Sequence, residues 1–301
     1  MLNSQTSDAM KKTKAIEAEK GRLFVVATPI GNLEDISLRA LRILKEADLI
    51  ACEDTRQTMK ILTHYDIHKR LVSYHEHNEI TRAPELVIEL EQGAKVVLVS
   101  DAGTPGISDP GRRLVGLCAR HGIPVTPVPG ASAFVAALAA SGMPAEEFAF
   151  IGFLPSRPTE RRKALRGLAD EPRTLAFYEA PHRLLDTLED ALEILGNRPA
   201  VIAREVTKVY EEFLRGHIEQ LVEQVRKKAP RGEITLLVAP SDGEATHAFL
   251  SVEPTVPLAR RVGEIMKERS VDRKAALKVA ARERGLTRRE AYKQLLITRD
   301  E

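Results

Sequence analysis

Three short loops rich in glycine, proline and small residues are the places where this chain could bind a ligand. They read TPIGN at 28–32, SDAGTPGISDPG at 100–111 and PVPGASA at 127–133. Glycine lets the backbone approach a ligand closely, and proline restricts a loop before anything binds. The middle loop also carries Asp101 and Asp109, whose carboxylates could bind hydroxyl groups or a cation. Any one of these loops could be a simple turn, but three together indicate a binding site.

These loops do not carry a phosphate-binding signature. The chain has no GxxxxGK[ST] sequence, and no GxGxxG follows the first apolar segment. The glycine-rich loop follows the fourth apolar segment and contains no lysine. A P-loop nucleotide site and a dinucleotide-binding Rossmann site are therefore excluded.

Each loop follows an apolar run typical of a strand buried on both faces. In the first half of the chain we expect strands at 23–27, 48–52, 71–74, 96–99 and 125–128, and helices at 38–44, 55–62, 78–90, 110–121 and 131–141, with Asn78 as an N-cap. Helices between buried strands imply a parallel sheet with helices on its faces. The three loops then fall at the carboxyl ends of strands, where open α/β sheets bind ligands.

A second unit begins near Met143. Strands are expected at 148–151, 175–178, 200–203, 212–214 and 234–238, with helices at 160–168, 182–195 and 218–228. Five strands with fewer helices indicate a mixed sheet with an antiparallel portion. The fold class is therefore α/β throughout both units.

The length of 301 residues fits two domains of about 150 residues with a full core each. We expect a disordered extension at 1–20, an α/β domain at 21–134, a second α/β domain at 135–243 and a helical module at 255–301. The extension has a basic start, but charged residues stand where the apolar part of a secretory signal would be. Met10 is an alternative start to Met1.

The last segment is basic, although the whole chain has a net charge of only +2. Residues 256–299 contain thirteen Lys or Arg and five Asp or Glu. Their apolar spacing is helical, and Gly285 and Thr287 resemble a helix stop followed by an N-cap. Three short helices with a basic face fit a helix-turn-helix-like RNA-binding module, but a solvated helical tail explains the same charge pattern.

Two cysteines, Cys52 and Cys118, are too few for a disulfide framework, which indicates a reducing, cytoplasmic compartment. The longest apolar run, 131–140, is too short to cross a bilayer, so no membrane association is expected. Four histidines, at 64, 68, 75 and 77, have a spacing that could hold a metal ion, but scattered surface histidines are the better interpretation. We therefore expect no metal site.

The three loops, in their order and spacing, resemble the motif set of the tetrapyrrole (corrin/porphyrin) methylase superfamily over roughly residues 22–240. The resemblance implies S-adenosylmethionine as cofactor, bound in a cleft between two α/β domains. By the same resemblance, the cofactor site would be lined by Pro29, Asp101, Ala102, Gly103, Thr104, Ile107, Ser132 and Ala133. Backbone amides and carbonyls would hold the cofactor there, which explains small residues in place of charged ones.

Within the superfamily, four further motifs are similar to the ribosomal small-subunit methyltransferase I branch. They are CEDTR at 52–56, YHEHNE at 74–79, FYEAPHR at 177–183 and REVTK at 204–208. The resemblance implies 2′-O-methylation of cytidine 1402 of 16S rRNA, a homodimer, and an RNA-binding role for the basic tail. The partner would then be 16S rRNA or the small ribosomal subunit.

A ribose hydroxyl is a poor nucleophile near neutral pH, so a side chain must accept or orient its proton. The candidate catalytic residues are Glu53, Asp54, Glu179 and Glu205, with His75 as a further proton acceptor. The candidate RNA-binding residues are Arg56, His75, Asn78, Arg157, Arg161, Arg162, Arg183 and Lys208, with Arg204 as a further phosphate contact. Any one of them could instead form a surface ion pair or a helix cap.

Two other functions fit parts of the sequence. A small-molecule methyltransferase acting on a precorrin or porphyrin-type ring would use the same loops, but it leaves the basic tail and the cluster at 157–166 unexplained. A non-catalytic RNA-binding assembly factor would explain the basic residues, but it gives no reason for three crowded glycine and proline loops.

Overall fold

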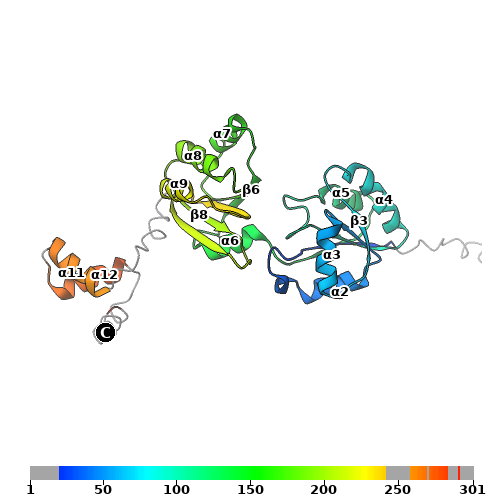
Figure 1. Cartoon of the computed structure of the whole chain (residues 1–301), viewed down its shortest axis with the longest axis horizontal. Helices are drawn as coiled ribbons and strands as arrows, with labels where there is room; N and C mark the ends of the chain where they lie inside the picture. Colours follow the sequence, from blue (N-terminus) through cyan, green and yellow to red (C-terminus); the bar gives the residue numbers. More distant parts are fainter. Residues whose placement is uncertain (1–19, 242–257, 270, 284–290, 292–301) are drawn as a thin grey trace, which may run out of the picture. The chain divides into compact units, whose positions relative to one another are not determined.

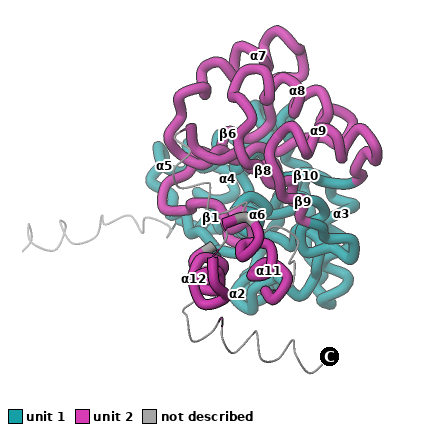
Figure 2. The backbone as a smooth tube through the Cα atoms, turned by 90° about the vertical axis from the view of Figure 1, so that its left-hand side faces the viewer, with its two compact units in different colours: residues 1–137, 204–212, 232–235 teal, residues 138–203, 213–231, 236–301 magenta. Residues whose placement is uncertain are grey.

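The computed structural model describes residues 20–241, 258–269, 271–283 and 291. The chain divides into two compact units (Figure 2), the first made of residues 1–137, 204–212 and 232–235 and the second of residues 138–203, 213–231 and 236–301. The first boundary falls at 137, where the sequence suggests 134. The segments 204–212 and 232–235 also belong to the first unit, although they come much later in the chain. The sequence pattern does not predict this. The expected extension at 1–19, the end of the second domain at 242–243 and the third tail helix with Gly285 and Thr287 lie outside the described residues.

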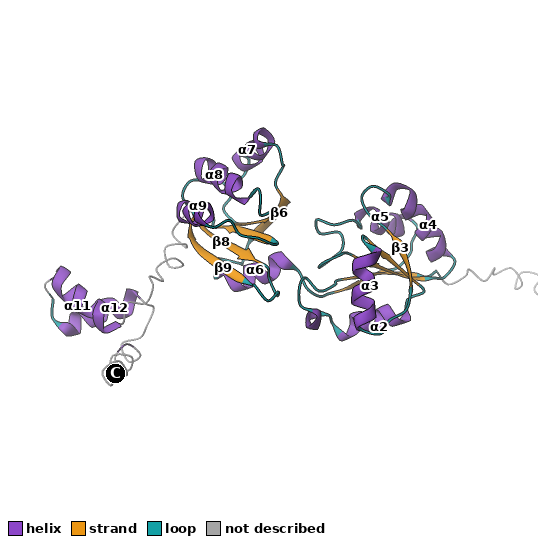
Figure 3. Cartoon of the chain, in the orientation of Figure 1, coloured by secondary structure: helices purple, strands orange, loops and turns teal. Residues whose placement is uncertain are grey.

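The first unit is built on a five-stranded sheet (Figure 3). Its strands are β1 (Arg22–Val26), β2 (Leu49–Cys52), β3 (Arg70–Ser73), β4 (Lys95–Val99) and β5 (Val125–Val128). Their order in the sheet is β3-β2-β4-β1-β5, and every neighbouring pair is parallel. The fold class and the parallel sheet predicted from the buried apolar runs are confirmed.

Helices cover both faces of this sheet (Figure 1). They are α2 (Leu38–Glu46), α3 (Thr55–His64), α4 (Glu79–Glu91) and α5 (Arg112–Arg120), together with a short 3-10 helix, η1 (Leu33–Asp35). Because strand side chains alternate between faces, the core divides into two clusters. Val26, Ile50 and Val97 pack with α2 and α3, whereas Leu23, Ala51 and Leu98 pack with α4 and α5. Both buried cysteines, Cys52 and Cys118, are free thiols within these clusters.

The second unit contains a mixed sheet. Its strands are β6 (Phe148–Phe153), β7 (Thr174–Glu179), β8 (Pro199–Arg204), β9 (Glu212–His217) and β10 (Ile234–Val238), in the order β6-β7-β10-β8-β9. The β6 and β7 strands are parallel. Neighbouring β8 and β9 are joined by seven residues, which is too short for a parallel crossover, so they are antiparallel. The antiparallel portion expected from sequence is present.

Four helices complete this part of the chain: α6 (Ala133–Ser141), which crosses the boundary between the units, α7 (Pro158–Arg166), α8 (Leu184–Leu195) and α9 (Ile218–Lys227). Apolar side chains on α8 and α9 are fully buried, including Leu188 and Leu221. Further along, α11 (Leu258–Arg269) and α12 (Arg273–Glu283) pack on each other through Val262, Ile265 and Ala280. Among the described residues, none of the helices combines the length and apolar character that a membrane span requires.

Candidate functional site

All five strands of the first sheet end at the same edge, because every neighbouring pair is parallel. The order β4-β1-β5 places the loops at 100–111, 28–32 and 129–133 side by side. The ends of β2 and β3 continue the edge with the motifs at 52–56 and 74–79. The sheet therefore gathers five of the motifs that the sequence singled out, although they are spread over more than one hundred residues of chain.

The first and second loops are bonded to each other through their backbones. The Thr28 N–H donates to the Gly103 carbonyl over 2.8 Å, and the Gly103 N–H donates to the Thr28 carbonyl over 3.1 Å. The hydroxyl of Ser100 donates to the same Gly103 carbonyl over 3.1 Å. Gly103 has a φ of +90°, where a side chain would be strained. This glycine is therefore required by the backbone at the centre of the candidate cofactor site.

The third loop is fastened to the second and lies close to β1. The Thr104 hydroxyl donates to the Ala131 carbonyl over 3.2 Å. A Cβ at Gly130 would lie 3.0 Å from the Cβ of Ala27, tighter than ordinary contact. Ser132 and Ala133 begin the α6 helix, where the Ser132 carbonyl accepts the Ala136 N–H. The three loops therefore form one connected frame.

The cofactor-binding residues expected from sequence occupy this frame in different ways. Thr104, Ser132 and Ala133 are half-buried, and Ala102 and Ile107 are exposed, so all five are accessible to a ligand. Pro29 is buried beneath the loop that it begins. None of the three loops contains Lys or Arg. A ligand with positive charge fits this edge better than a polyphosphate does.

Asp101 links the ends of two neighbouring strands. Its Oδ1 accepts the backbone N–H of Asp54 over 2.9 Å, so the loop after β4 is bonded to the loop after β2. One carboxylate oxygen of Asp101 thus has a structural role, whereas the sequence analysis assigned this residue only to ligand binding.

Asp54 caps the α3 helix. Its Oδ1 accepts the Arg56 backbone N–H over 2.8 Å, and its Oδ2 accepts from the Arg56 guanidinium over 2.7 Å. These bonds to Arg56 lower the pKa of Asp54 to about 2. A carboxylate held so firmly in its ionised form is a poor proton acceptor. The structure therefore favours a capping role for Asp54 over the catalytic role considered from sequence.

Glu53 differs from its neighbour in its electrostatic surroundings. It is half-buried, and burial raises its pKa above the ordinary value, with Asp101, Glu76 and Asp54 adding to the rise and His75 opposing it. A carboxylate with a raised pKa binds a proton more readily near neutral pH. Of the four catalytic candidates, Glu53 has the environment that proton transfer requires.

His75 and Asn78 form a turn after β3. The Asn78 Oδ1 accepts the His75 backbone N–H over 2.9 Å, and its Nδ2 donates to the Ser73 carbonyl over 3.2 Å. Asn78 occupies the N-cap position of α4, but its side chain makes no capping bond there because it holds this turn instead. The expectation that its side chain caps the helix is wrong.

Asp109 is the second carboxylate of the middle loop, which the sequence analysis names as able to bind a hydroxyl group or a cation but does not place among the cofactor-site residues. Burial raises its pKa to about 7, with Glu53 and Asp101 adding to the rise and the nearby Ser100 hydroxyl opposing it. The residue before it, Ser108, has a φ of +60°, in the left-handed region that residues other than glycine rarely adopt. Its only sequence signal was its position before a proline in a glycine-rich loop, which is too common to identify a site.

This raised pKa predicts a pH dependence of stability. An unfolded aspartate titrates near pH 4, so between about pH 4 and 7 the folded protein holds a proton that the unfolded chain releases. The stabilisation from Asp109 is therefore complete below about pH 4 and is lost as the pH rises through 7. Asp109→Asn is expected to be more stable than the wild type at pH 8 and to differ little from it at pH 4, as measured by thermal unfolding.

Asp54→Asn is the matched control, because the pKa of Asp54 is shifted in the opposite direction. Loss of the Asp54 carboxylate is expected to destabilise the protein at pH 8, and this loss of stability should become smaller as the pH falls toward 2. An Asp109→Asn variant that is less stable than the wild type at pH 8 would refute a buried, protonated Asp109.

Glu205 and Lys208 form a clamp in the segment 204–212 of the first unit. The Glu205 Oε1 accepts the Glu233 backbone N–H and the Lys208 ammonium, each over 2.9 Å. Burial acts to raise the pKa of Glu205, but these two bonds outweigh it and lower the pKa. A Cβ at Gly31 would lie 2.3 Å from the Cγ of Lys208. The clamp thus packs on the first loop, which is why this segment clusters with the first unit.

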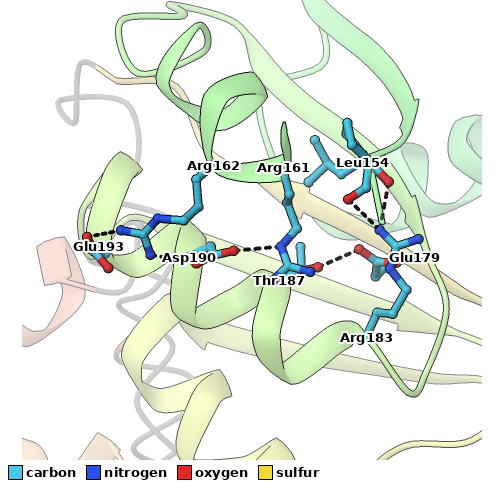
Figure 4. Close-up of polar contacts among 9 residues, drawn as sticks. Leu154, Arg161, Arg162, Glu179, Arg183, Thr187, Asp190 and Glu193 are labelled. Carbon is cyan, nitrogen blue, oxygen red and sulfur yellow. Dashed lines mark hydrogen bonds and ion pairs between the residues drawn. The ribbon is translucent and has the colours of Figure 1, made fainter. Parts of the chain in front are cut away.

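In the second unit, Glu179 and Arg183 hold the scaffold together (Figure 4). The buried Glu179 carboxylate accepts the Ala180 N–H over 2.8 Å and the Thr187 hydroxyl over 2.6 Å. The Arg183 guanidinium donates to the Leu154 carbonyl over 2.7 Å. Glu179 therefore joins the end of β7 to α8, and Arg183 fixes the loop after β6. These contacts support positioning roles in place of the catalytic and RNA-binding roles suggested by sequence.

The basic cluster on α7 is divided by burial (Figure 4). Arg161 is only 4% exposed in its side chain and donates to Asp190 over 2.7 Å, so its guanidinium does not reach solvent. Arg162 donates to Asp190 over 2.8 Å and also pairs with Glu193. Arg157 is 81% exposed. This burial favours a structural role for Arg161 over the RNA contact expected from sequence, whereas Arg157 has the exposure that an RNA contact needs.

Metal binding has no geometric basis in the part of the chain that the structure describes. No three His, Cys, Asp or Glu side chains meet there in a group that could hold an ion. His64 meets Tyr65 in an edge-to-face contact, and His68 pairs with Asp66. These histidines serve separate local contacts.

Comparison with known proteins gives a consistent result for most of the chain. The family model for tetrapyrrole (corrin/porphyrin) methylases matches residues 22–222. A protein from Halalkalibacterium halodurans, named ribosomal RNA small subunit methyltransferase I, is 50% identical over 278 residues, which cover 91% of this chain and 94% of that protein. The protein of the same name from Escherichia coli O157:H7 is 42% identical, covering 92% of this chain and 100% of the relative.

Solved structures share the fold at lower identity. A cobalt precorrin-4 methyltransferase superimposes with a TM-score of 0.57 and 18% identity, covering 72% of this chain and 94% of the other. A uroporphyrin-III C-methyltransferase from Thermus thermophilus, solved with S-adenyl homocysteine, has a TM-score of 0.51 and 24% identity, covering 73% of this chain and 98% of the other. These likenesses confirm the architecture described above.

Proposed function

Because this chain belongs to the tetrapyrrole (corrin/porphyrin) methylase family, we propose that it is an S-adenosylmethionine-dependent methyltransferase of small-subunit ribosomal RNA. The observation that carries this function is the 50% identity, over 91% of the chain, to a protein named ribosomal RNA small subunit methyltransferase I. The target atom that fits best is the ribose 2′-oxygen of cytidine 1402 in 16S rRNA, which is the site implied by the four branch-specific motifs.

The loop frame at the carboxyl edge of the first sheet suits this cofactor. S-adenosylmethionine supplies a methyl group made electrophilic by its positively charged sulfur. The residues present fit such a group, because Asp101 contributes a carboxyl group to the edge and the three loops contain no Lys or Arg. Thr104 would offer backbone groups, and Ile107 and Ala133 an apolar lining, whereas the backbone groups of Gly103 are bonded to Thr28 and Ser100 within the frame.

Methyl transfer to a hydroxyl oxygen requires alignment of the two groups and removal of the hydroxyl proton. The raised pKa of Glu53 suits it to accept that proton. Asp101 positions Glu53 indirectly, since it holds the Asp54 N–H next to it. Asp54, Glu179 and Glu205 would act as a helix cap, a scaffold bond and a loop clamp.

The phosphates of the RNA would be bound by exposed guanidinium groups. Arg56 follows the end of β2 and is 86% exposed, and Arg157 occupies the N-cap position just before α7. Arg162 has half-buried contacts with Asp190 and Glu193 but keeps part of its surface accessible. His75 and Asn78 would contribute from the turn after β3. We further propose that the protein acts as a homodimer, as the branch resemblance implies, and in the cytoplasm, as its two cysteines indicate.

Transfer of a radiolabelled methyl group tests this function. Small-subunit particles that lack the modification are expected to accept label from S-adenosylmethionine at one nucleotide, which mapping would identify as cytidine 1402. Label at a base or at another nucleotide would refute the proposed target atom. A free tetrapyrrole precursor in a parallel reaction tests the small-molecule alternative, and calorimetric titration with the cofactor tests the non-catalytic alternative.

Removing residues 255–301 is expected to weaken RNA binding and leave cofactor binding intact. The described part of this tail, α11 and α12, carries eight Lys or Arg, and its apolar residues pack within the tail. Because phosphate contacts release counterions, the truncated protein should also show a shallower decline of RNA affinity with salt. Filter binding across a salt series measures both effects. Unchanged affinity and slope would mean that the tail is a solvated appendage.

A further inference from the structure

Three aromatic rings meet near the carboxyl ends of β6 and β7 in the second unit. Phe153 pairs with Tyr178 in the parallel register, and their ring centroids are 5.6 Å apart. Phe150 also contacts Tyr178, and the centroids of these two rings are 5.0 Å apart. The three rings therefore form one aromatic cluster, which we call the Phe153 cluster.

An irregularity in β6 produces this arrangement. Residues three apart on a regular strand face opposite sides of the sheet. The register shifts between Phe150 and Gly152, so Ile151 is an extra residue, and Gly152 has a φ of +75°. The bulge brings Phe150 and Phe153 to the same face, where both reach Tyr178. A bulge at a strand end often redirects a side chain next to a functional site.

The cluster is open to solvent on one side. Phe153 is 57% exposed and Tyr178 is half-buried. The adjacent Phe177 points to the other face of the sheet and is buried in the core. Phe153 is also the more exposed of the two exposed phenylalanines of β6, at 57% against 39% for Phe148. The exposed face of the ring is available to another flat, apolar group.

The loop that follows Phe153 is basic and firmly held. The Arg183 guanidinium donates to the carbonyls of Leu154 and Pro155, over 2.7 and 3.0 Å. Arg157 then occupies the N-cap position just before α7, and its exposed pairing with Glu160 at 3.4 Å is of the weak surface kind. Lys163 and Arg166 are exposed on the same helix. An exposed aromatic ring beside a basic helix matches the chemistry of a single-stranded nucleic acid, which presents flat bases on a negative backbone.

We propose that Phe153, supported by Tyr178, stacks on a base of the single-stranded RNA substrate while Arg157 binds a neighbouring phosphate. This proposal rests on the proposed function and assigns part of the RNA-binding surface to the second unit. A second copy of this chain would also cover an aromatic cluster, but the positive charge around the ring favours a polyanion over a copy carrying the same charges. Stacking of a base on an aromatic ring is tolerant of sequence, so the ring would contribute affinity and leave target choice to other contacts.

The absence of tryptophan from this chain allows a direct test. Phe153→Trp introduces a single indole, whose emission should be quenched when an RNA oligonucleotide spanning cytidine 1402 is added. Phe148→Trp is the matched control, because Phe148 is 39% exposed but lies at the opposite end of the same strand. Quenching is expected to saturate with RNA concentration in Phe153→Trp and to be absent in Phe148→Trp.

Affinity measurements on further variants separate stacking from packing. Phe153→Ala is expected to bind the oligonucleotide roughly 5- to 150-fold more weakly, the range reported for loss of one stacked base. Phe153→Leu keeps an apolar side chain without a ring and should be nearly as weak, whereas Phe153→Tyr should bind like the wild type. Affinity for S-adenosylmethionine and the unfolding temperature should be the same in all three variants.

Two results would overturn the stacking proposal. One is RNA methylation by the wild type together with unquenched emission in Phe153→Trp. The other is emission that changes with protein concentration but not with RNA, which would make the cluster a contact between chains. Failure of the proposed function is a separate outcome: the wild type would then transfer no methyl group to small-subunit particles, even where RNA quenches the indole at position 153.

Discussion

Replacing Glu53 with glutamine is expected to lower the rate of methyl transfer by about 10²- to 10⁴-fold, the range for removal of a general base, and to leave S-adenosylmethionine affinity unchanged. The variant keeps the size of the side chain but cannot accept the hydroxyl proton. The environment of Glu53 supports this role, because burial together with Asp101 and Glu76 raises its pKa. Single-turnover kinetics and calorimetric titration measure the two quantities independently.

The pH dependence of the same reaction provides a second readout. A proton acceptor works in its ionised form, so the wild-type rate should rise as the pH passes through the raised pKa of Glu53 and then level off. Glu53→Gln should show no such rise. A merely structural Glu53 would instead give equal losses of turnover, cofactor affinity and stability on substitution.

Asp54→Ala is the control for this experiment. The two residues are adjacent in sequence, but Asp54 caps α3 and pairs with Arg56. Its removal is expected to lower the unfolding temperature, because a helix N-cap is lost, and to leave turnover close to that of the wild type. A loss of turnover in Asp54→Ala as large as in Glu53→Gln would transfer the catalytic assignment to the pair.

Arg161→Ala is expected to destabilise the protein by about 3 kcal/mol or more, the cost of leaving one member of a buried ion pair without its partner. Arg161 donates to Asp190 over 2.7 Å, and both side chains are largely buried. Arg162 also donates to Asp190, so the charge of Asp190 remains partly compensated in Arg161→Ala. The loss of unfolding free energy should therefore be close to about 3 kcal/mol and not far above it. Urea unfolding measures the free energy directly.

Arg157→Ala separates stability from RNA binding in this cluster. Arg157 lies four residues before Arg161, and its only described ion pair is exposed, so its loss should leave the unfolding free energy within about 0.5 kcal/mol of the wild type. RNA affinity should nevertheless fall, because a phosphate contact is removed. The reverse pattern, with Arg161→Ala stable and weak in RNA binding, would restore the RNA-binding role that the sequence alone suggests for Arg161.

The amino-acid sequence by itself determined the strands, most of the helices and the loops that carry the site. The apolar run at Val96–Val99 predicts a buried strand, and the glycines after it predict a tight loop. Both signals can be recognised because they depend on residues that are neighbours in the chain. Five such runs with helices between them were also sufficient to predict a parallel sheet. That prediction placed three loops at one edge, where the structure has them.

Tertiary structure alone decided what each charged side chain does. Asp190 lies 29 residues after Arg161, and Glu233 lies 28 residues after Glu205, so no local pattern could reveal these partners. The pKa of Asp109 likewise depends on burial and on Glu53, which lies after another strand of the sheet and comes near it only in the folded chain. A charge has the same sequence signature whether it meets solvent, an ion-pair partner or a substrate. Its role follows from burial and proximity, which exist only once the chain has folded.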